Sequence, residues 1–341
     1  MTFSVIHNEL ELFSPVDNRT EIFDADRWEN LITLLIPQLK IFNFVFEIRF
    51  YDLDRDKLLY QFKRFQTDFW HKQHHWYTVC ELTEKSALIY SIPYCLTNYR
   101  LESDIKIDSN LPIDKSRLYD NITQLNFTVK RINQRIHHYF PNIKWLQLKF
   151  GYGLLPATFD DQVLQLLEMS VNLMNVQILE ISHLVDIESP LILLQILKQT
   201  PNLSLIVLTP KCLISSLTNN ELCKYLNKLI KKLVIFARDG LSSIDSNQLI
   251  QFCETFSNLE QLQCSVQHPN DLIFILEHLS QLSHITIKYS TNFDLSMENI
   301  YQKLQKFGST LHKNFLYEFD SNAASENENT HLNIWLSYNH K

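Results

Sequence analysis

A short apolar phrase recurs along the chain and constrains its fold more than any other feature. In the copy at Asn142–Leu148, an Asn precedes an apolar residue, and two further apolar residues follow at fixed spacing. Other copies begin at Asn121, Asn175, Asn202 and Asn258, and copies without the Asn run over Ile230–Ile235, Leu282–Ile287 and, more weakly, Leu39–Phe44. A repeat of this kind defines a whole architecture, because each copy contributes the same element to one stack.

Between the copies the apolar spacing changes from every second residue to every third or fourth residue. The first spacing is typical of a strand and the second of a helix with one buried side. Helices are therefore predicted between the strands, over residues 160–169, 190–198, 222–229, 246–256, 272–279 and 296–307. Strands that are joined by helical crossovers pair in parallel, so the phrase predicts one parallel sheet.

Capping residues mark where several of these helices begin. Asp160 and Asp161 place carboxylates in a first helical turn, where the helix dipole favours them. Ser189 followed by Pro190 combines an N-cap residue with a proline at the first helical position. The run Thr218 to Glu221 has the pattern of a capping box.

Three copies open with Pro-Asn-Leu or a close variant: Pro37-Gln38-Leu39, Pro141-Asn142-Ile143 and Pro201-Asn202-Leu203. The phrase and these openings resemble the leucine-rich repeat in its longer form, as in ribonuclease-inhibitor-like and F-box/leucine-rich-repeat proteins. The resemblance implies an α/β fold, namely a leucine-rich-repeat solenoid (horseshoe) with a parallel concave sheet, outer helices and an irregular N-terminal part. Most copies follow one another at about the 20–29 residues of this family.

The resemblance divides the chain into three parts. Residues 1–115 are expected to form irregular N-terminal repeats or a cap, with a helix over 53–65 and strands near 76–80 and 87–94. Residues 116–320 form the repeat solenoid. Residues 321–341 are expected to hold a mobile polar segment and then a C-terminal strand over 332–337 that covers the sheet edge.

The chain departs from the family pattern at one position of each repeat. The family has Asn or Cys eight residues after the first apolar anchor, where the side chain bonds the neighbouring turn. The residues at these positions here are Gly151, Leu184, Lys211, Arg238, Gln267 and Ser290. A regular asparagine ladder is therefore not expected at this position.

Composition argues against several classes of function. The formal net charge is -7 and no Lys/Arg block stands out, so nucleic acid is not an expected partner. Only 4 glycines are present, and Gly151 and Gly153 are not followed by the third glycine of a dinucleotide loop, so no cofactor is expected. No run of about 18 apolar residues predicts a membrane span. The six cysteines lack the spacing of a disulfide framework or metal site, which favours a cytoplasmic protein, with the nucleus as the alternative.

Few residues have the pattern of a catalytic or metal site. His71, His74 and His75 have spacings that can bring imidazoles together, but flanking aromatic residues favour a structural role. Asp160 with Asp161, and Asp52 with Asp54, are paired carboxylates that helix starts explain equally well. We therefore expect no catalytic, cofactor-binding or metal-binding residue, and no enzyme activity.

The open side of the predicted sheet is the better candidate for a functional surface. Residues between the apolar anchors of each strand point away from the core, because side chains alternate along a strand. Several of these residues are apolar in adjacent copies, and a contiguous exposed apolar patch commonly marks an interaction site. The expected protein-binding residues of this concave face are Trp145, Ile178, Leu205, Val207, Val234 and Phe236.

The sequence therefore favours a non-catalytic protein-binding leucine-rich-repeat module with a protein partner. The resemblance implies that it could be the substrate-recognition part of an F-box-type ubiquitin-ligase receptor, although no F-box segment is found in this chain. A scaffold unrelated to ubiquitin ligases, a metal-dependent protein that uses His71, His74 and His75, and a gene-family member without a selected partner are the alternatives.

Overall fold

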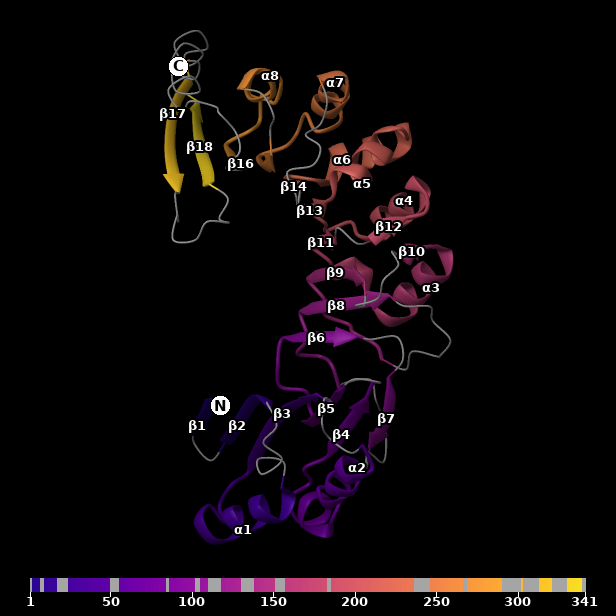
Figure 1. Ribbon diagram of the computed structural model, residues 1–341, viewed down its shortest axis with the longest axis vertical. Helices are drawn as coiled ribbons and strands as arrows, with labels where there is room; N and C mark the ends of the chain where they lie inside the picture. The colour runs from indigo at the N-terminus through magenta and orange to yellow at the C-terminus, as the bar shows by residue number, and fades with distance from the viewer. Residues whose placement is uncertain are drawn as a thin grey trace. The chain divides into compact units, whose positions relative to one another are not determined.

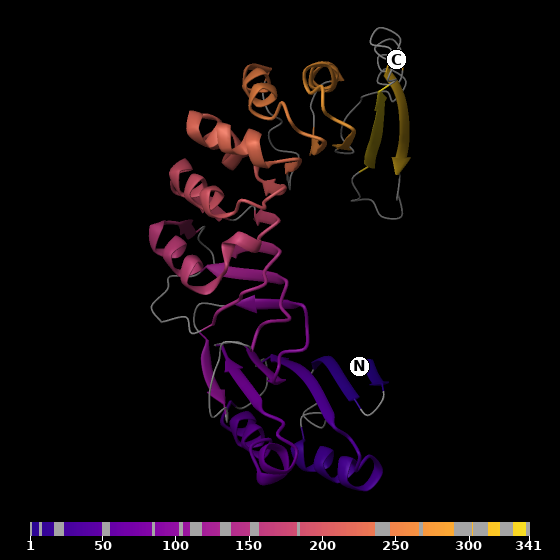
Figure 2. The ribbon, with the colours of Figure 1, turned by 180° about the vertical axis from the view of Figure 1, so that it is seen from behind.

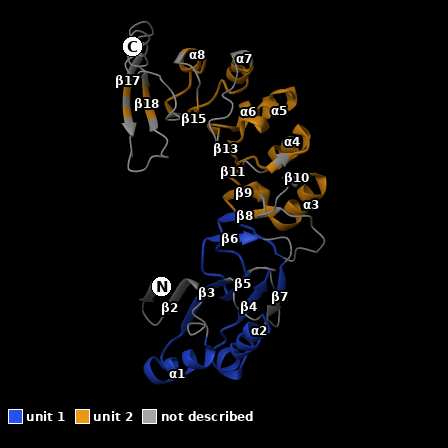
Figure 3. Ribbon diagram, in the orientation of Figure 1, with its two compact units in different colours: residues 1–125, 130–142 blue, residues 126–129, 143–341 orange. Residues whose placement is uncertain are grey.

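Figure 1 shows the fold of the chain in a computed structural model. The structure describes residues 2–6, 9–16, 24–49, 55–83, 86–101, 105–109, 118–129, 138–150, 157–182, 185–235, 246–265, 269–289, 302, 313–320 and 330–338. The chain divides into two compact units (Figure 3). Unit 1 comprises residues 1–125 and 130–142, and unit 2 comprises residues 126–129 and 143–341.

Unit 1 is built on a mixed sheet with the strand order β1-β2-β3-β5-β4-β7. Only β2 and β3 are parallel, and the other neighbours are antiparallel. The strands of this sheet are β1 (Thr2–Ile6), β2 (Glu9–Val16), β3 (Ile41–Arg49), β4 (Thr78–Leu82), β5 (Ser86–Ser91) and β7 (Lys106–Ser109). The unit also contains β6 (Asn98–Leu101) and the first residues of β8 (Gln124–Val129).

Helices α1 (Ala25–Leu35) and α2 (Arg55–Arg64) and the short π-helix η2 (Phe69–Gln73) pack on this sheet. Asp24 caps α1 because its carboxylate accepts from the backbone N–H groups of Asp26 and Arg27. The core between helices and sheet is aromatic, with Phe42, Phe44, Phe62, Phe65 and Trp70 all fully buried. The predicted helix over 53–65 and the strands near 76–80 and 87–94 correspond to α2, β4 and β5.

Six copies of the repeated phrase, from Ile143 to Ile287, form adjacent strands of one sheet in unit 2. The copy that begins at Asn121 is on β8, which is divided between the two units, and the weaker copy Leu39–Phe44 falls on β3 of unit 1. The strand order of the unit 2 sheet from β9 onward is β9-β11-β13-β14-β15-β16-β18-β17. All neighbours from β9 to β16 are parallel, whereas β18 is antiparallel to both β16 and β17. The strands are β9 (Trp145–Phe150), β11 (Ile178–Ile181), β13 (Leu205–Leu208), β14 (Lys232–Ile235), β15 (Gln261–Ser265), β16 (His284–Tyr289), β17 (Lys313–Asp320) and β18 (Thr330–Tyr338).

The helices of unit 2 lie together on one side of these strands (Figures 1 and 2). They are α3 (Asp161–Ser170), the 3₁₀ turn η4 (Leu173–Asn175), α4 (Pro190–Gln199), α5 (Pro210–Leu217), α6 (Asn220–Leu229), α7 (Ser246–Thr255) and α8 (Pro269–His278). A small parallel pair, β10 (Ala157–Phe159) with β12 (Val185–Ile187), accompanies them. The prediction of an α/β chain with a mostly parallel sheet is confirmed.

The apolar anchors of the phrase form the core of unit 2. In the copy on β9, Ile143, Leu146 and Leu148 are each 0% exposed. The corresponding residues of the other copies are buried as well: Val176, Leu179, Ile181, Leu203, Ile206, Leu208, Ile230, Leu233, Ile235, Leu259, Leu262, Cys264, Leu282, Ile285 and Ile287. Since one strand cannot enclose its own apolar side, stacking neighbouring copies supplies the missing wall.

Local capping explains where the unit 2 helices begin. Asp160 accepts from the backbone N–H of Val163, and Ser189 accepts from that of Leu191, as the sequence predicted. The predicted capping box at Thr218 was wrong in its first residue, because Asn219 is the residue that caps α6 by accepting from Leu222. Thr218 instead donates its hydroxyl to the carbonyl oxygen of Ser215 in the preceding helix.

Helix α5 was not predicted, and its own cap explains it. Thr209 accepts from the backbone N–H of Cys212, and Pro210 occupies the first helical turn. Lys211, one of the six residues at the position eight after the first anchor, lies inside this helix.

Asparagine side chains do bridge neighbouring copies, but from the start of the phrase. Within unit 2, Asn202 Nδ2 donates to the carbonyl oxygen of Met174 at 2.8 Å, and Asn258 Nδ2 donates to that of Asn227 at 3.5 Å. Within unit 1, Asn142 Nδ2 donates to the carbonyl oxygen of Asp120 at 2.9 Å. The Asn that precedes the first apolar anchor of these copies therefore links neighbouring copies.

The C-terminal strand predicted over 332–337 is β18, which pairs with the last parallel strand, β16. Several other predictions fall outside the described residues. These are the polar segment 321–329, most of the helix predicted over 296–307, the Gly151–Gly153 loop, the pair Asp52 and Asp54, and the face residue Phe236.

Candidate functional site

The open face of the unit 2 sheet presents two rows of side chains that cross its strands. Strand register fixes both rows, since paired residues on neighbouring strands point to the same side. The first row is Trp145, Ile178, Leu205, Lys232, Gln261, His284 and Trp335. The second row is Gln147, Glu180, Val207, Val234, Gln263, Thr286 and Asn333. The open face is defined here as these two rows.

Five of the six predicted binding residues lie together at one end of the open face. Trp145 is 37% exposed. Ile178, Leu205, Val207 and Val234 are partly exposed, although the residues that alternate with them along each strand are buried. These four aliphatic residues and Trp145 form a contiguous patch, called the apolar block below. Apolar groups that stay in contact with water in this way are typical of interaction surfaces.

The remaining part of the open face is polar and aromatic. The imidazole of His284 stacks on Trp335 with ring centroids 5.2 Å apart and planes inclined by 13°. Burial against this neighbour lowers the pKa of His284, which favours its neutral form. The Thr286 hydroxyl donates to Asn333 Oδ1 at 2.8 Å, so both rows connect β16 to β18 through side chains.

The three histidines predicted as an alternative metal site have different surroundings. His71 Nε2 lies 4.0 Å from an Asp68 carboxylate oxygen, and His74 stacks on Trp76 with ring centroids 4.2 Å apart. His75 is exposed and has a φ of 57°. Across the described ranges, no group of three or more His, Cys, Asp or Glu side chains could hold a metal ion.

In the part of the chain that the structure describes, neither the paired carboxylates nor the cysteine thiols have the surroundings of catalytic groups. Asp160 is the α3 cap, and the adjacent Asp161 is exposed in the first turn. No disulfide joins any of the six cysteines, all of which lie in the described ranges. Burial raises the pKa of Cys253 and Cys264 to about 12, so neither thiol provides a nucleophilic thiolate near neutral pH.

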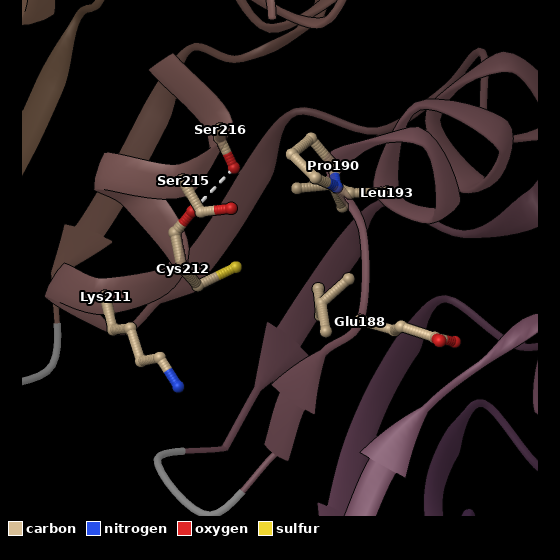
Figure 4. A pocket seen from close by; sticks show the side chains of 8 residues that line it. Glu188, Pro190, Leu193, Lys211, Cys212, Ser215 and Ser216 are labelled. Atoms are coloured by element: carbon tan, nitrogen blue, oxygen red, sulfur yellow. Dashed lines mark hydrogen bonds between the residues drawn. The ribbon is translucent and has the colours of Figure 1, made fainter. Parts of the chain in front are cut away.

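A cavity of about 290 Å³ lies among the helices of unit 2. Ile187, Pro190 and Leu193 form an apolar wall near the start of α4, and α5 contributes Lys211, Cys212, Ser215 and Ser216. Figure 4 shows the Cys212 thiol pointing from α5 toward α4, whereas the Glu188 carboxylate points away from α5. This mixed lining indicates no particular class of ligand.

Unit 1 contains a buried polar network that sequence reasoning missed. The Glu81 carboxylate accepts hydroxyl hydrogen bonds from Tyr90 at 2.6 Å, from Tyr119 at 3.4 Å and from Tyr99. His138 Nε2 lies 3.0 Å from Glu81 Oε1. Glu81 is 2% exposed and His138 is 5% exposed, so the network is enclosed and joins separate segments of unit 1.

The network also affects its tyrosines electrostatically. Burial, followed by the charge of Glu81, raises the pKa of Tyr90, Tyr99 and Tyr119 well above the ordinary value of 10.0. An acid between the apolar residues Cys80 and Leu82 of β4 was the available sequence signal. His138 is a buried hydrogen-bond partner of Glu81.

Comparisons with known proteins add little to this description. No protein-family model matches the chain, and no curated protein sequence matches it. Among solved structures, the chain is similar to one described as a putative rRNA-methylase from Clostridium thermocellum. The two share 12% identity with a TM-score of 0.21, and the match covers 40% of this chain and 87% of that chain.

This match corrects one expectation. The sequence led us to expect a protein without enzyme activity, and similarity to a structure with an enzyme's name contradicts that expectation, which is withdrawn. A TM-score of 0.21 carries no argument about fold, active site or substrate, so no activity is assigned in its place. Among the described helices, none has the length and apolarity that crossing a bilayer requires.

Proposed function

We propose that the chain is a protein-binding module of the leucine-rich-repeat type, in which unit 2 is a solenoid that holds a partner protein on its open face. The observation that carries the proposal is the apolar block. Trp145, Ile178 and Leu205 lie side by side on three parallel strands and remain in contact with water, while the anchors next to them in sequence are buried. Tryptophan is also among the residues most often found at the energetic centre of protein interfaces.

The repeat type is supported by three features of unit 2. The phrases form parallel neighbouring strands, their anchors share one core, and helices follow on one side. The asparagine bridges, such as that from Asn202 to Met174, supply the contacts between copies that the family obtains from its ladder. The Pro-Asn-Leu opening that contains Asn202 favours the F-box type, so we extend the proposal to substrate recognition for a ubiquitin ligase.

Site-specific crosslinking in cells would test the binding surface. A photoreactive p-benzoylphenylalanine placed at Leu205, in the apolar block, should give a discrete adduct with a partner protein. The matched control is the same substitution at Leu191, which is 54% exposed on α4 on the helix side of unit 2. Equal adducts from both positions, or none from Leu205, would contradict the proposal.

Ubiquitin-ligase recruitment needs its own measurement. Affinity purification of the full chain should recover a ligase scaffold if the chain serves as a substrate receptor. A purification that recovers the Leu205 adduct partner without a ligase scaffold would remove this extension and leave the binding surface intact.

A further inference from the structure

The charged side chains of the open face and its border are unevenly distributed. Lys232, in the first row, is exposed and forms no ion pair with another described residue. Lys149 follows Trp145 and Gln147 on the same side of β9 and is partly exposed. The acidic residue Glu180 accepts a hydrogen bond from the Gln147 amide through its carboxylate. Among the described side chains on this side of the sheet near the apolar block, the two ammonium groups of Lys232 and Lys149 outnumber the one carboxylate of Glu180, although the formal net charge of the chain is -7.

Lys232 adjoins the apolar block directly. It pairs in register with Leu205 on the neighbouring strand, and Val234 lies two residues further along its own strand. Its aliphatic stem can therefore lie along apolar side chains while its ammonium group remains in water. A partner that covers the apolar block brings its own side chains next to this ammonium group, where the water that screens charges is partly excluded.

The register sets the spacing that a partner must match. Trp145 and Lys232 belong to the same row and are separated by three steps between neighbouring strands. Strands lie ~4.8 Å apart, so the two positions are separated by about 14 Å along the row. An extended segment advances ~3.3 Å per residue, and its alternate residues share one side, so about four residues span this distance.

We propose that the partner presents an acidic, apolar segment to the open face, with apolar side chains on the apolar block and a carboxylate on Lys232. This inference rests on the proposed function and adds the chemistry of the partner. In an extended segment, apolar residues at positions i and i+2 contact the region from Trp145 to Leu205, and an Asp or Glu near position i+4 reaches Lys232. Charge complementarity of this kind selects partners and fixes their register on the surface.

Selection from a library of random 16-residue peptides displayed on phage tests the proposal, with the folded full chain as the target. The expected result is enrichment of peptides that combine apolar residues with Asp or Glu about two residues beyond the last apolar position. A synthetic peptide from the selection should bind Lys232→Glu at least ~5-fold more weakly than the wild type, the equivalent of ~1 kcal/mol. Replacing its acidic residue by the amide should weaken binding to the wild type by a similar factor.

The matched control variant is Lys224→Glu, which makes the same charge change at an exposed position of α6. It should leave peptide affinity unchanged within about twofold. Helix α6 lies on the helix side of unit 2 and the peptide binds the open face, so solvent screens the charge at position 224 from the acidic residue of the peptide. Thermal unfolding followed by circular dichroism confirms that both variants are folded before affinities are compared.

Two outcomes overturn the proposal and are distinguishable from each other. If Trp145→Ala weakens peptide binding but Lys232→Glu does not, or if the selection enriches no acidic peptide, the acidic partner is wrong and the binding face stands. If selected peptides bind Trp145→Ala as well as the wild type, they do not use the apolar block, and the proposed function fails together with this inference.

Discussion

The side-chain amide of Asn202 donates a hydrogen bond to the backbone carbonyl oxygen of Met174 at 2.8 Å, and so joins two consecutive copies of the repeated phrase. Met174 lies in the η4 turn before β11, and Asn202 lies just before β13. The bond gives the Met174 carbonyl group a side-chain partner at the turn that leads into β11.

Asn202→Asp should therefore destabilise unit 2. The substitution replaces a donor with a carboxylate that faces the Met174 carbonyl oxygen, and loss of the bond should lower the free energy of unfolding by ~0.5–1.5 kcal/mol. Denaturant unfolding at neutral pH measures the change. The control Asn220→Asp introduces the same charge in the first turn of α6, where the helix dipole favours it, and should be neutral or slightly stabilising. Equal losses in both variants would mean that charge, and not the bridge, is responsible.

Leu146→Ala and Ile206→Ala should each lower the free energy of unfolding by ~2–5 kcal/mol, because each removes a fully buried anchor and leaves a cavity. Trp145→Ala should be milder, since the Trp145 side chain keeps part of its surface in water. Chemical denaturation of the three variants provides the comparison. If Trp145→Ala were as damaging as Leu146→Ala, the open face would be assigned to the wrong side of the sheet.

Glu81→Leu should destabilise unit 1 by ~3–5 kcal/mol, because it removes the acceptor shared by three tyrosine hydroxyls and His138 while leaving those groups buried. Glu81→Gln, which retains one acceptor oxygen, should lose less. The appropriate measurement is hydrogen exchange of the amides in β4 and β5, which reports on unit 1 separately. Similar exchange in wild type and Glu81→Leu would show that the network contributes no stability.

Stability should fall at alkaline pH. Tyr90 and Tyr99 have folded-state pKa values well above the unfolded value of about 10, so the folded protein holds their protons more tightly than the unfolded chain. Their contribution is complete below pH ~10 and decreases as pH rises beyond it. Cys264, with a folded-state pKa of about 12, adds a loss that begins near pH ~9.

Free energies of unfolding measured from pH 8 to pH 11 should show this decrease, and Tyr90→Phe should make the curve less steep above pH ~10. The variant removes one of the groups that must titrate when the chain unfolds. A wild-type curve that stays flat up to pH ~11 would contradict the burial of these hydroxyl groups.

Features that depend on neighbouring residues could be predicted from the sequence. The alternation of Leu146, Gln147 and Leu148 predicts which side of β9 is buried and which is open. The spacing between copies of the repeated phrase, with a helix in each interval, predicts that the strands are parallel. Ser189 with Pro190 marks the start of α4. The same signal, an N-cap residue followed by proline, is present at Thr209 and Pro210 and could have revealed α5.

Features that depend on the meeting of distant segments could not be predicted. The carbonyl partner of Asn202 belongs to another copy of the phrase, so the sequence shows the amide without its acceptor. The Glu81 network joins residues separated by up to 57 positions, and no local pattern indicates that Glu81 and His138 meet. In the candidate site, alternation predicted that Leu205 is open to solvent, whereas the position of Lys232 directly beside Leu205 follows from the strand register.

The antiparallel strand β18 occupies the edge of β16 where another parallel strand would otherwise pair. The strand of an added copy could pair beside β16 only by displacing β18. A change in the number of copies is therefore accommodated most simply among the strands from β9 to β16, where each neighbour is parallel.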